Sequence, residues 1–166
     1  MRLFYLLILV FLAAFCQGSL VTVFPFLWVN PDLVLLIVVF NAFLKGSREG
    51  ALVGFFGGLF QDLATGSYIG MNALSLMAAG YLVGLTQSKL LRESSLIITF
   101  LVWLSSIAAQ LISYILLASM EVYISPGVAL LRVIIPTAIF TSILAPVFYP
   151  RFYKSCRKGM LRNRNI

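Results

Sequence analysis

The feature that most constrains this chain is a succession of apolar segments separated by short polar loops. A helix needs roughly 20 apolar residues to cross a hydrocarbon core about 30 Å thick. Four of the segments have a length of that order, and two are shorter. The sequence therefore predicts an all-α polytopic membrane protein. The six segments cover residues 3–24, 33–44, 50–61, 69–87, 95–119 and 127–149.

The composition excludes a soluble domain. Hydrophobic residues make up 61% of the 166 residues and charged residues only 10%, whereas soluble domains are roughly 45–50% apolar. So few charges cannot cover a globule of this size with solvated surface. The length allows one domain. We expect residues 1–150 to form a single six-helix transmembrane domain and residues 151–166 to form a basic cytoplasmic tail.

The second and third segments are short, at roughly 18 Å for 12 helical residues. The intervening "KGSREG" carries three charges, which are costly at mid-bilayer. Two interpretations of these segments are possible: they form two short helices that meet at the membrane surface, or they form a re-entrant hairpin. Further along, Pro136 and Pro146 lie inside the sixth segment and predict a kink or a loosened backbone ladder there.

The distribution of basic residues favours six full spans. With a cytoplasmic N-terminus and six crossings, 11 of the 12 Lys and Arg residues fall on the inner side. The positive-inside rule therefore predicts that both termini are cytoplasmic. Asp32, Asp62 and Glu121 fall on the outer side. The inner basic residues are Arg2, Lys45, Arg48, Lys89, Arg92, Arg151, Lys154, Arg157, Lys158, Arg162 and Arg164.

Small residues recur every four positions along the third segment. Small residues at i and i+4 let helices approach closely in lipid. Two interpretations are compatible: tight packing within the bundle, and a groove that accepts the helix of another protein. The face consists of Gly50, Gly54, Gly57 and Gly58, and the fourth segment repeats the spacing with Gly80 and Gly84.

Asp62 follows this face by four residues, before a glycine-bearing turn. A carboxylate there can cap the start of the fourth helix, where the helix dipole favours negative charge. The alternative is an ion pair between Asp62 or Asp32 and Arg132, because an intramembrane cation needs a partner or must snorkel.

The residues give no support for catalysis, and we expect no enzyme, metal or cofactor. The chain has no histidine, and no nucleophile and base stand at a recognisable spacing. The tail predicts an anchor on anionic lipids, with a docking site for cytoplasmic partners as the alternative; nucleic acid binding has no support beyond charge. The basic residues of the tail are Arg151, Lys154, Arg157, Lys158, Arg162 and Arg164.

One stretch resembles a known family. The order Gly54-Phe55, Gly58, Asp62-Leu63, Gly66-Ser67 and Gly70 resembles the signature of the MreD family. These are small bacterial inner-membrane proteins needed for rod shape. The flanking "NPDLVLLIVVF" and "ALSLMAAGYLVGL" fit the same pattern, so that the similarity covers roughly residues 31–90. The signature positions are Gly54, Phe55, Gly58, Asp62, Leu63, Gly66, Ser67 and Gly70.

The resemblance implies membership of the lateral-wall elongation machinery. MreD-like proteins accompany a bitopic MreC-like protein, MreB filaments, a RodA-type glycosyltransferase and a class B penicillin-binding protein. The resemblance also implies a six-helix fold like that of the substrate-binding subunits of energy-coupling-factor transporters. The function expected on this basis is a non-enzymatic scaffold of peptidoglycan elongation that seats the MreC-like transmembrane helix on the glycine-rich face.

The main alternative is a small-solute (vitamin) binding subunit of an energy-coupling-factor-type uptake transporter. Such a subunit needs polar and aromatic groups that converge from several outer helix ends. Its first span also tends to carry an alanine-rich docking face, whereas this one is bulky. The candidates for convergence are Trp28, Asn30, Asp32, Asp62, Tyr68, Asn72 and Tyr123.

Overall fold

The computed structural model describes residues 2–23, 31–66, 68–87, 95–120 and 125–158. Within these ranges the regular structure is entirely helical, and no strand is present. The last three elements follow one another without a break, so the described residues form six rods. The elements are α1 (Arg2–Val23), α2 (Leu33–Lys45), α3 (Ser47–Thr65), α4 (Met71–Leu85), α5 (Ser95–Ser119), α6 (Pro126–Val128), the π-helical η1 (Ala129–Ile134) and α7 (Ile135–Lys158).

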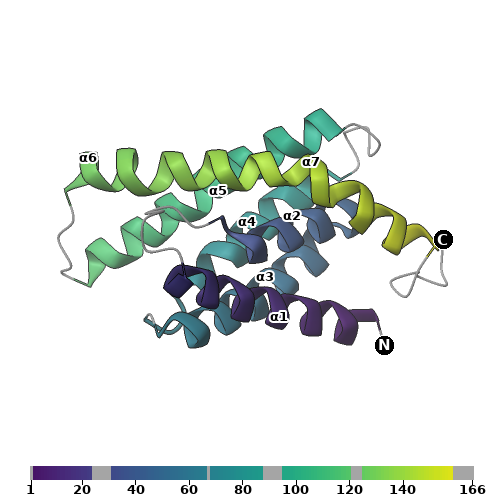
Figure 1. Ribbon diagram of the computed structural model, residues 1–166, viewed down its shortest axis with the longest axis horizontal. Helices are drawn as coiled ribbons and strands as arrows, with labels where there is room; N and C mark the ends of the chain where they lie inside the picture. Colours follow the sequence, from purple (N-terminus) through teal and green to yellow (C-terminus); the bar gives the residue numbers. More distant parts are fainter. Residues whose placement is uncertain (1, 24–30, 67, 88–94, 121–124, 159–166) are drawn as a thin grey trace.

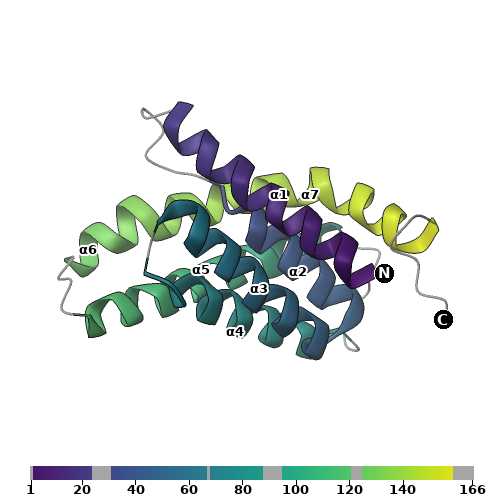
Figure 2. The same ribbon diagram turned by 90° about the horizontal axis from the view of Figure 1, so that it is seen from below.

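The rods form one bundle around α2. This helix contacts α1, α3, α4, α5 and α7, and Figures 1 and 2 show it between the layer of α5 and α7 and the layer of α1 and α3. Nearly every α2 side chain is buried, from Val34 to Leu44. A helix that is apolar all round belongs in the core of a bundle, which explains the continuous hydrophobic run of this segment.

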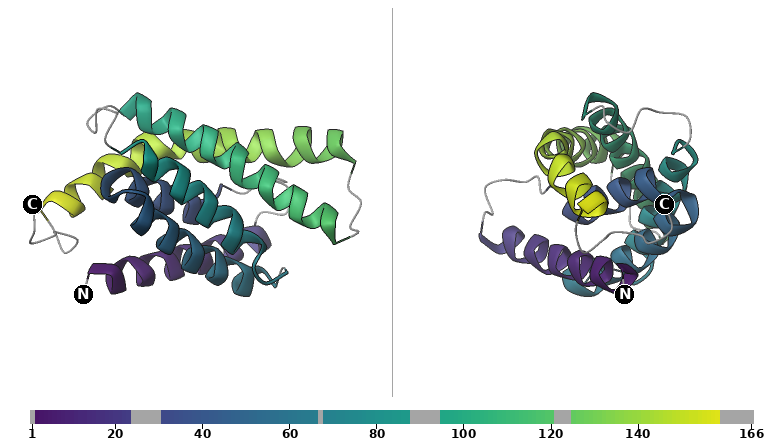
Figure 3. Two further views of the ribbon diagram at one scale, coloured as in Figure 1. Left: turned by 180° about the vertical axis from the view of Figure 1, so that it is seen from behind. Right: turned by 90° about the vertical axis from the view of Figure 1, so that its right-hand side faces the viewer.

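The start of α1 and the end of α7 lie at the same end of the bundle (Figure 1). That arrangement follows from an even number of rods that alternate in direction. At the opposite end, α5 and the α6–α7 run extend beyond the shorter helices (Figure 3). The bundle therefore has an end with the start of α1 and the end of α7, called here the terminal end, and a far end.

The third helix is longer than the apolar run that predicted it. It spans 19 residues and includes Arg48 and Glu49 in its first turn, so the expectation of a short third helix is wrong, while α2 is short, at 13 residues. A single residue, Gly46, separates the two helices, with φ 96° and ψ −179°. Charged residues extend α3 because they lie at the terminal end of the bundle, outside the apolar part.

Much of the described outer surface is apolar. Large exposed hydrophobic side chains occur on α1, α3, α4, α5 and α7, for example Phe4, Leu63, Leu82, Leu96 and Ile143. Residues 96–119 and 126–154 are long and apolar enough to cross a membrane, and α2 and α4 are shorter apolar helices. A soluble monomer rarely exposes so much contiguous apolar surface, so this exterior suits a lipid environment.

Proline shapes the last rod in two places. Pro136 is the second residue after η1, whose wider turn is marked by the hydrogen bond from the N–H of Ile135 to the carbonyl of Leu130. A proline ring clashes with the carbonyl four residues earlier in an α-helix, and the π segment accommodates it. Figure 1 shows that α7 bends in its final part, in the region that holds Pro146 and Pro150. The predicted kink and loosened ladder are both present.

Candidate functional site

The glycines of α3 lie against the backbone of α4. A Cβ atom on Gly50 would lie 2.6 Å from the carbonyl oxygen of Gly80 and 2.5 Å from Cβ of Ala42 on α2. A Cβ on Gly54 would lie 2.7 Å from the carbonyl carbon of Leu76, and one on Gly58 would meet the backbone of residues 72 and 73. Side chains at these positions would push two backbones apart, so the glycines allow the closest helix contact in the bundle.

Gly84 and Gly57 differ in what they face. A Cβ on Gly84 of α4 would meet the backbone of Ser47, which continues the same interface toward the terminal end. A Cβ on Gly57 would instead lie 2.9 Å from Val10 Cγ1 and 3.0 Å from Val34 Cγ1. Gly57 therefore makes room for side chains of α1 and α2 rather than for a backbone.

This placement corrects the expectation that the glycine face seats a partner helix. Gly50, Gly54, Gly57 and Gly58 are buried inside the bundle, and α4 covers three of them. The internal packing predicted from the spacing is present. No open surface remains at these positions for the helix of another protein.

Asp62 caps the start of α4. Its Oδ2 accepts hydrogen bonds from the N–H of Gly70 at 2.8 Å and of Ala73 at 3.4 Å, and its Oδ1 accepts one from the N–H of Asn72 at 3.2 Å. The carboxylate is 1% exposed. Backbone donors at a helix N-terminus have no partner within their own helix, so the cap predicted from the sequence satisfies buried groups.

Two of the remaining signature positions, Gly66 and Gly70, form the turn around this cap. Gly66 and Gly70 have φ values of 64° and 103°, a region that favours glycine, and they end α3 and begin α4. Phe55 and Leu63 are 36% and 62% exposed and face outward. The spaced glycines and Asp62 thus form one device that joins α3 closely to α4.

Arg132 and the acids of the expected ion pair differ in their burial and in their partners. Arg132 lies on the exposed side of η1, whereas Asp62 is buried and accepts three backbone N–H groups. Asp32 is likewise engaged in hydrogen bonds away from that surface. In the part of the chain that the structure describes, no recorded contact joins Arg132 to either acid.

Asp32 organises a polar cluster at the far end. Its Oδ1 accepts the N–H of Leu35 at 2.9 Å as the cap of α2, and its own N–H donates to Oγ1 of Thr141 on α7 at 3.0 Å. The side chains of Gln17 and Gln61 lie beside its carboxylate. Oε1 of Gln17 accepts the N–H of the residue after Asp32 at 3.2 Å. Four rods therefore meet around Asp32.

A polar cavity of about 210 Å³ adjoins this cluster inside the bundle. Its wall receives side chains from every rod, at the far end of each. Oε1 of Gln61 is buried there without a hydrogen-bond partner. The polar residues of the wall are Gln17, Asp32, Gln61, Asn72, Ser75, Gln110, Ser113 and Thr137.

Sequence reasoning anticipated this cavity only in part. Asp32 and Asn72 were expected at a convergence of outer helix ends, and both line it. Tyr68 is 53% exposed and does not line it, and Trp28, Asn30 and Tyr123 lie outside the described residues. Gln17, Gln61 and Gln110 were missed. Their signal was available, because an amide in the middle of an apolar segment is costly in lipid unless it faces the interior.

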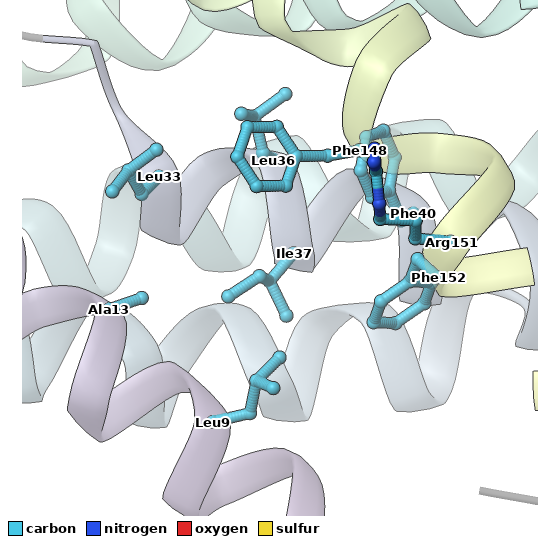
Figure 4. A pocket seen from close by; sticks show the side chains of 9 residues that line it. All are labelled: Leu9, Ala13, Leu33, Leu36, Ile37, Phe40, Phe148, Arg151 and Phe152. Carbon is cyan, nitrogen blue, oxygen red and sulfur yellow. The ribbon is translucent and has the colours of Figure 1, made fainter. Parts of the chain in front are cut away.

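A second hollow, called here the α1–α7 groove, opens between the first and last rods. α1 and α7 do not contact each other, and α2 lies between them. Figure 4 shows side chains of α1 on one side, those of α7 on the other, and those of α2 at the base. Its volume is about 340 Å³, and apart from Arg151 its wall is apolar. The lining residues are Leu9, Ala13, Leu33, Leu36, Ile37, Phe40, Phe148, Arg151 and Phe152.

The basic tail begins within α7. The helix continues to Lys158, so no structural boundary falls at residue 151. The side chains of Arg151 and Lys154 are exposed at the terminal end of the bundle. The side chains of Arg157 and Lys158, and all of Arg162 and Arg164, lie outside what the structure describes.

The bundle, its apolar exterior and its glycine-based interface define a helical membrane protein whose described residues include no group of three or more potential metal-ligating side chains. The chain belongs to the MreD family, since a family model described as rod shape-determining protein MreD matches residues 1–159. The predicted family is confirmed over nearly the whole chain. No curated protein and no solved structure gives a significant match.

The family places the protein in the membrane part of the cell-shape elongation machinery. It is a family of structural, shape-determining proteins rather than a known enzyme family. The fold likeness to energy-coupling-factor subunits stays a prediction, because no solved structure matches.

Proposed function

We propose that this protein is a non-enzymatic scaffold of the peptidoglycan elongation complex, and that the α1–α7 groove seats the transmembrane helix of a bitopic, MreC-like partner. The observation that carries the proposal is the gap in the bundle. Because α1 and α7 do not contact each other, neither helix covers the part of α2 that forms the base of the groove. The glycine interface, by contrast, is filled within the chain by α4.

The chemistry of the groove suits a partner helix. Leu9, Leu36, Ile37 and Phe148 offer an apolar wall, and a volume of about 340 Å³ receives side chains of a neighbouring helix rather than the helix itself. Knobs of one helix that enter holes on another provide the packing that drives association in lipid. Arg151 lies on the α7 side of the groove (Figure 4).

The proposed setting is the bacterial inner membrane, with six spans and both termini in the cytoplasm. The positive-inside distribution supports this orientation, and the shared location of the start of α1 and the end of α7 agrees with it (Figure 1). The basic tail would then contact anionic lipids and lie on the side of MreB filaments. The RodA-type glycosyltransferase and the class B penicillin-binding protein would be further members of the assembly.

The polar cavity bears on the transporter alternative. Sites for drug-sized or cofactor-sized ligands have volumes of about 300–1,000 Å³, and this cavity has about 210 Å³. It also has no aromatic residue in its wall. Both features favour the scaffold over vitamin uptake.

A filling substitution tests the groove. Ile37→Trp should reduce co-purification of the MreC-like partner at least tenfold, because the indole occupies the space that the partner's side chains enter. Leu52→Trp is the matched control, since Leu52 is 50% exposed on α3 and lies outside the groove. Equal recovery of the partner with both variants, each inserted at wild-type levels, would contradict the proposed seat.

A further inference from the structure

The α1–α7 groove contains one charged side chain, that of Arg151. The other residues that line it are apolar. Arg151 belongs to the final part of α7, and this part of the helix lies at the terminal end of the bundle (Figure 1). The groove therefore combines an apolar wall with a single positive charge.

The guanidinium of Arg151 has unused hydrogen-bonding capacity. Its Nη1 donates to the carbonyl of Val147 at 3.1 Å, which turns the group back along α7, away from the end of the helix. A guanidinium has five N–H groups in a planar fork. Within the part of the chain that the structure describes, no acidic side chain and no second acceptor is recorded for it. Most of its N–H groups are thus available to a ligand.

These features select a ligand that is anionic at one end and apolar elsewhere. A guanidinium binds phosphate in a bidentate geometry. Basic pockets between transmembrane helices on the cytoplasmic side of a membrane bind anionic lipid headgroups, and the proposed orientation places Arg151 on that side. A carboxylate on the partner helix is the other candidate. It is disfavoured, because the cytoplasmic flank of a transmembrane helix is enriched in basic residues.

We propose that the α1–α7 groove binds an anionic phospholipid, with its phosphate at Arg151 and an acyl chain against Leu9, Ile37 and Phe148. Figure 4 shows Leu9 and Phe148 on opposite sides of the groove and Ile37 between them. The volume of about 340 Å³ lies in the range of about 300–1,000 Å³ that ligand sites have. An acyl chain is also much thinner than a helix, which is about 10–12 Å across with its side chains.

The lipid and the partner helix would use the same wall. The lipid therefore occupies the groove when the partner is absent, and it leaves when the partner binds. This exchange rests on the proposed function. The lipid site itself does not, because it depends only on the groove and on Arg151.

Thermal unfolding of the full chain, purified in mild detergent without a partner, tests the site. Dioleoylphosphatidylglycerol should raise Tm in a saturable way, by roughly 5–10 °C at a hundred times Kd. Dioleoylphosphatidylcholine at the same mole fraction should raise Tm less than half as much, because its choline cation would lie beside the guanidinium. Inorganic phosphate should leave Tm unchanged, since it has no apolar part to fill the groove.

Two matched pairs of variants locate the site. Arg151→Gln should abolish the shift with phosphatidylglycerol, whereas Lys154→Gln should retain it, because Lys154 is exposed further along α7 and does not line the groove. Ile37→Trp should also abolish the shift, since the indole fills the space of the acyl chain. Leu52→Trp should retain it, because Leu52 is exposed on α3 outside the groove.

Four results would overturn the lipid site. Equal shifts with both lipids would show general solvation by lipid, and an equal shift with inorganic phosphate would show an ion site that does not need the groove. Loss of the shift in Arg151→Gln and Lys154→Gln alike would show diffuse attraction to the basic end. No shift with any probe would show that the groove holds no lipid, and reduced partner recovery with Arg151→Gln would then assign the charge to a carboxylate of the partner.

The lipid site and the partner seat can fail separately. Tm is measured on protein without a partner, so a groove that seats no helix leaves the lipid shift intact. Conversely, Ile37→Trp can reduce recovery of the partner although no lipid raises Tm.

Discussion

At the residue scale, what a glycine faces decides what its replacement costs. A Cβ on Gly54 meets the carbonyl carbon of Leu76, whereas one on Gly57 meets only methyl groups of Val10 and Val34. Side chains can rotate away, but the backbone of a packed helix cannot. Gly54 and Gly57 lie three residues apart on one helix. Substitutions at these two positions therefore distinguish the effect of contact with a backbone from that of contact with side chains.

We expect Gly54→Ala to destabilise the protein and Gly57→Ala to leave it nearly unchanged. Overpacking costs about 1–3 kcal/mol, and it exceeds the gain of up to about 1 kcal/mol from placing alanine in a helix. Gly54→Ala should lower Tm by roughly 2–10 °C, as measured by thermal unfolding in detergent. Equal Tm values for the two variants would contradict the close contact of α3 with α4.

At the element scale, the α2–α3 hairpin depends on one backbone conformation. Gly46 has φ 96° and ψ −179°, a region that only glycine adopts without strain. A Cβ there would also lie 2.5 Å from Oε1 of Gln87, whose Nε2 donates to the carbonyl of Leu44 at 3.1 Å. Gly46 thus lies between the end of α2 and the start of α3. The side chain of Gln87, just after α4, packs beside it.

Gly46→Ala should therefore destabilise the hairpin by about 1–3 kcal/mol, the cost of a strained backbone conformation. Gly127→Ala provides the control, because a Cβ on Gly127 meets nothing within 4 Å and its φ is not positive. The free energy of unfolding in detergent and denaturant measures both. If Gly46→Ala were as stable as Gly127→Ala, the tight connection would not exist in solution.

At the scale of the whole molecule, apolar side chains fill the core and also cover the exterior, while several polar groups are buried. Gln17, Gln61, Asp62 and Thr141 are buried, while large apolar side chains cover the exterior. The core is apolar as in a soluble domain, but much of the exposed surface is apolar as well. This exterior suits a lipid environment.

The proposed orientation predicts which turns are accessible from outside. In a Cys16→Ser, Cys156→Ser background, Tyr68→Cys should react with a membrane-impermeant maleimide in intact spheroplasts, because Tyr68 is 53% exposed in the turn between α3 and α4. Lys154→Cys should react only after permeabilisation. Labelling of Lys154→Cys in intact spheroplasts would reverse the orientation.

The sequence by itself determined the class, the family and the limits of α5. Segment 95–119 matches α5 residue for residue, because a polar loop on each side stops an apolar helix. The same reasoning failed at α3, whose charged first turn lies beyond the apolar run. The spacing of the glycines predicted a close interface, and the position of Asp62 predicted its cap, since both follow from local helix geometry.

Only the tertiary structure decided which surface each residue faces. Helix periodicity places Gly54 and Gly58 on one stripe, but it cannot say whether α4 or another protein covers that stripe. Gln17, Asp32 and Gln61 come from three separate segments, and their meeting at one cavity depends on how the rods pack. The α1–α7 groove likewise exists because two rods at opposite ends of the chain fail to touch. Such relations between distant segments are properties of packing, and no local pattern encodes them.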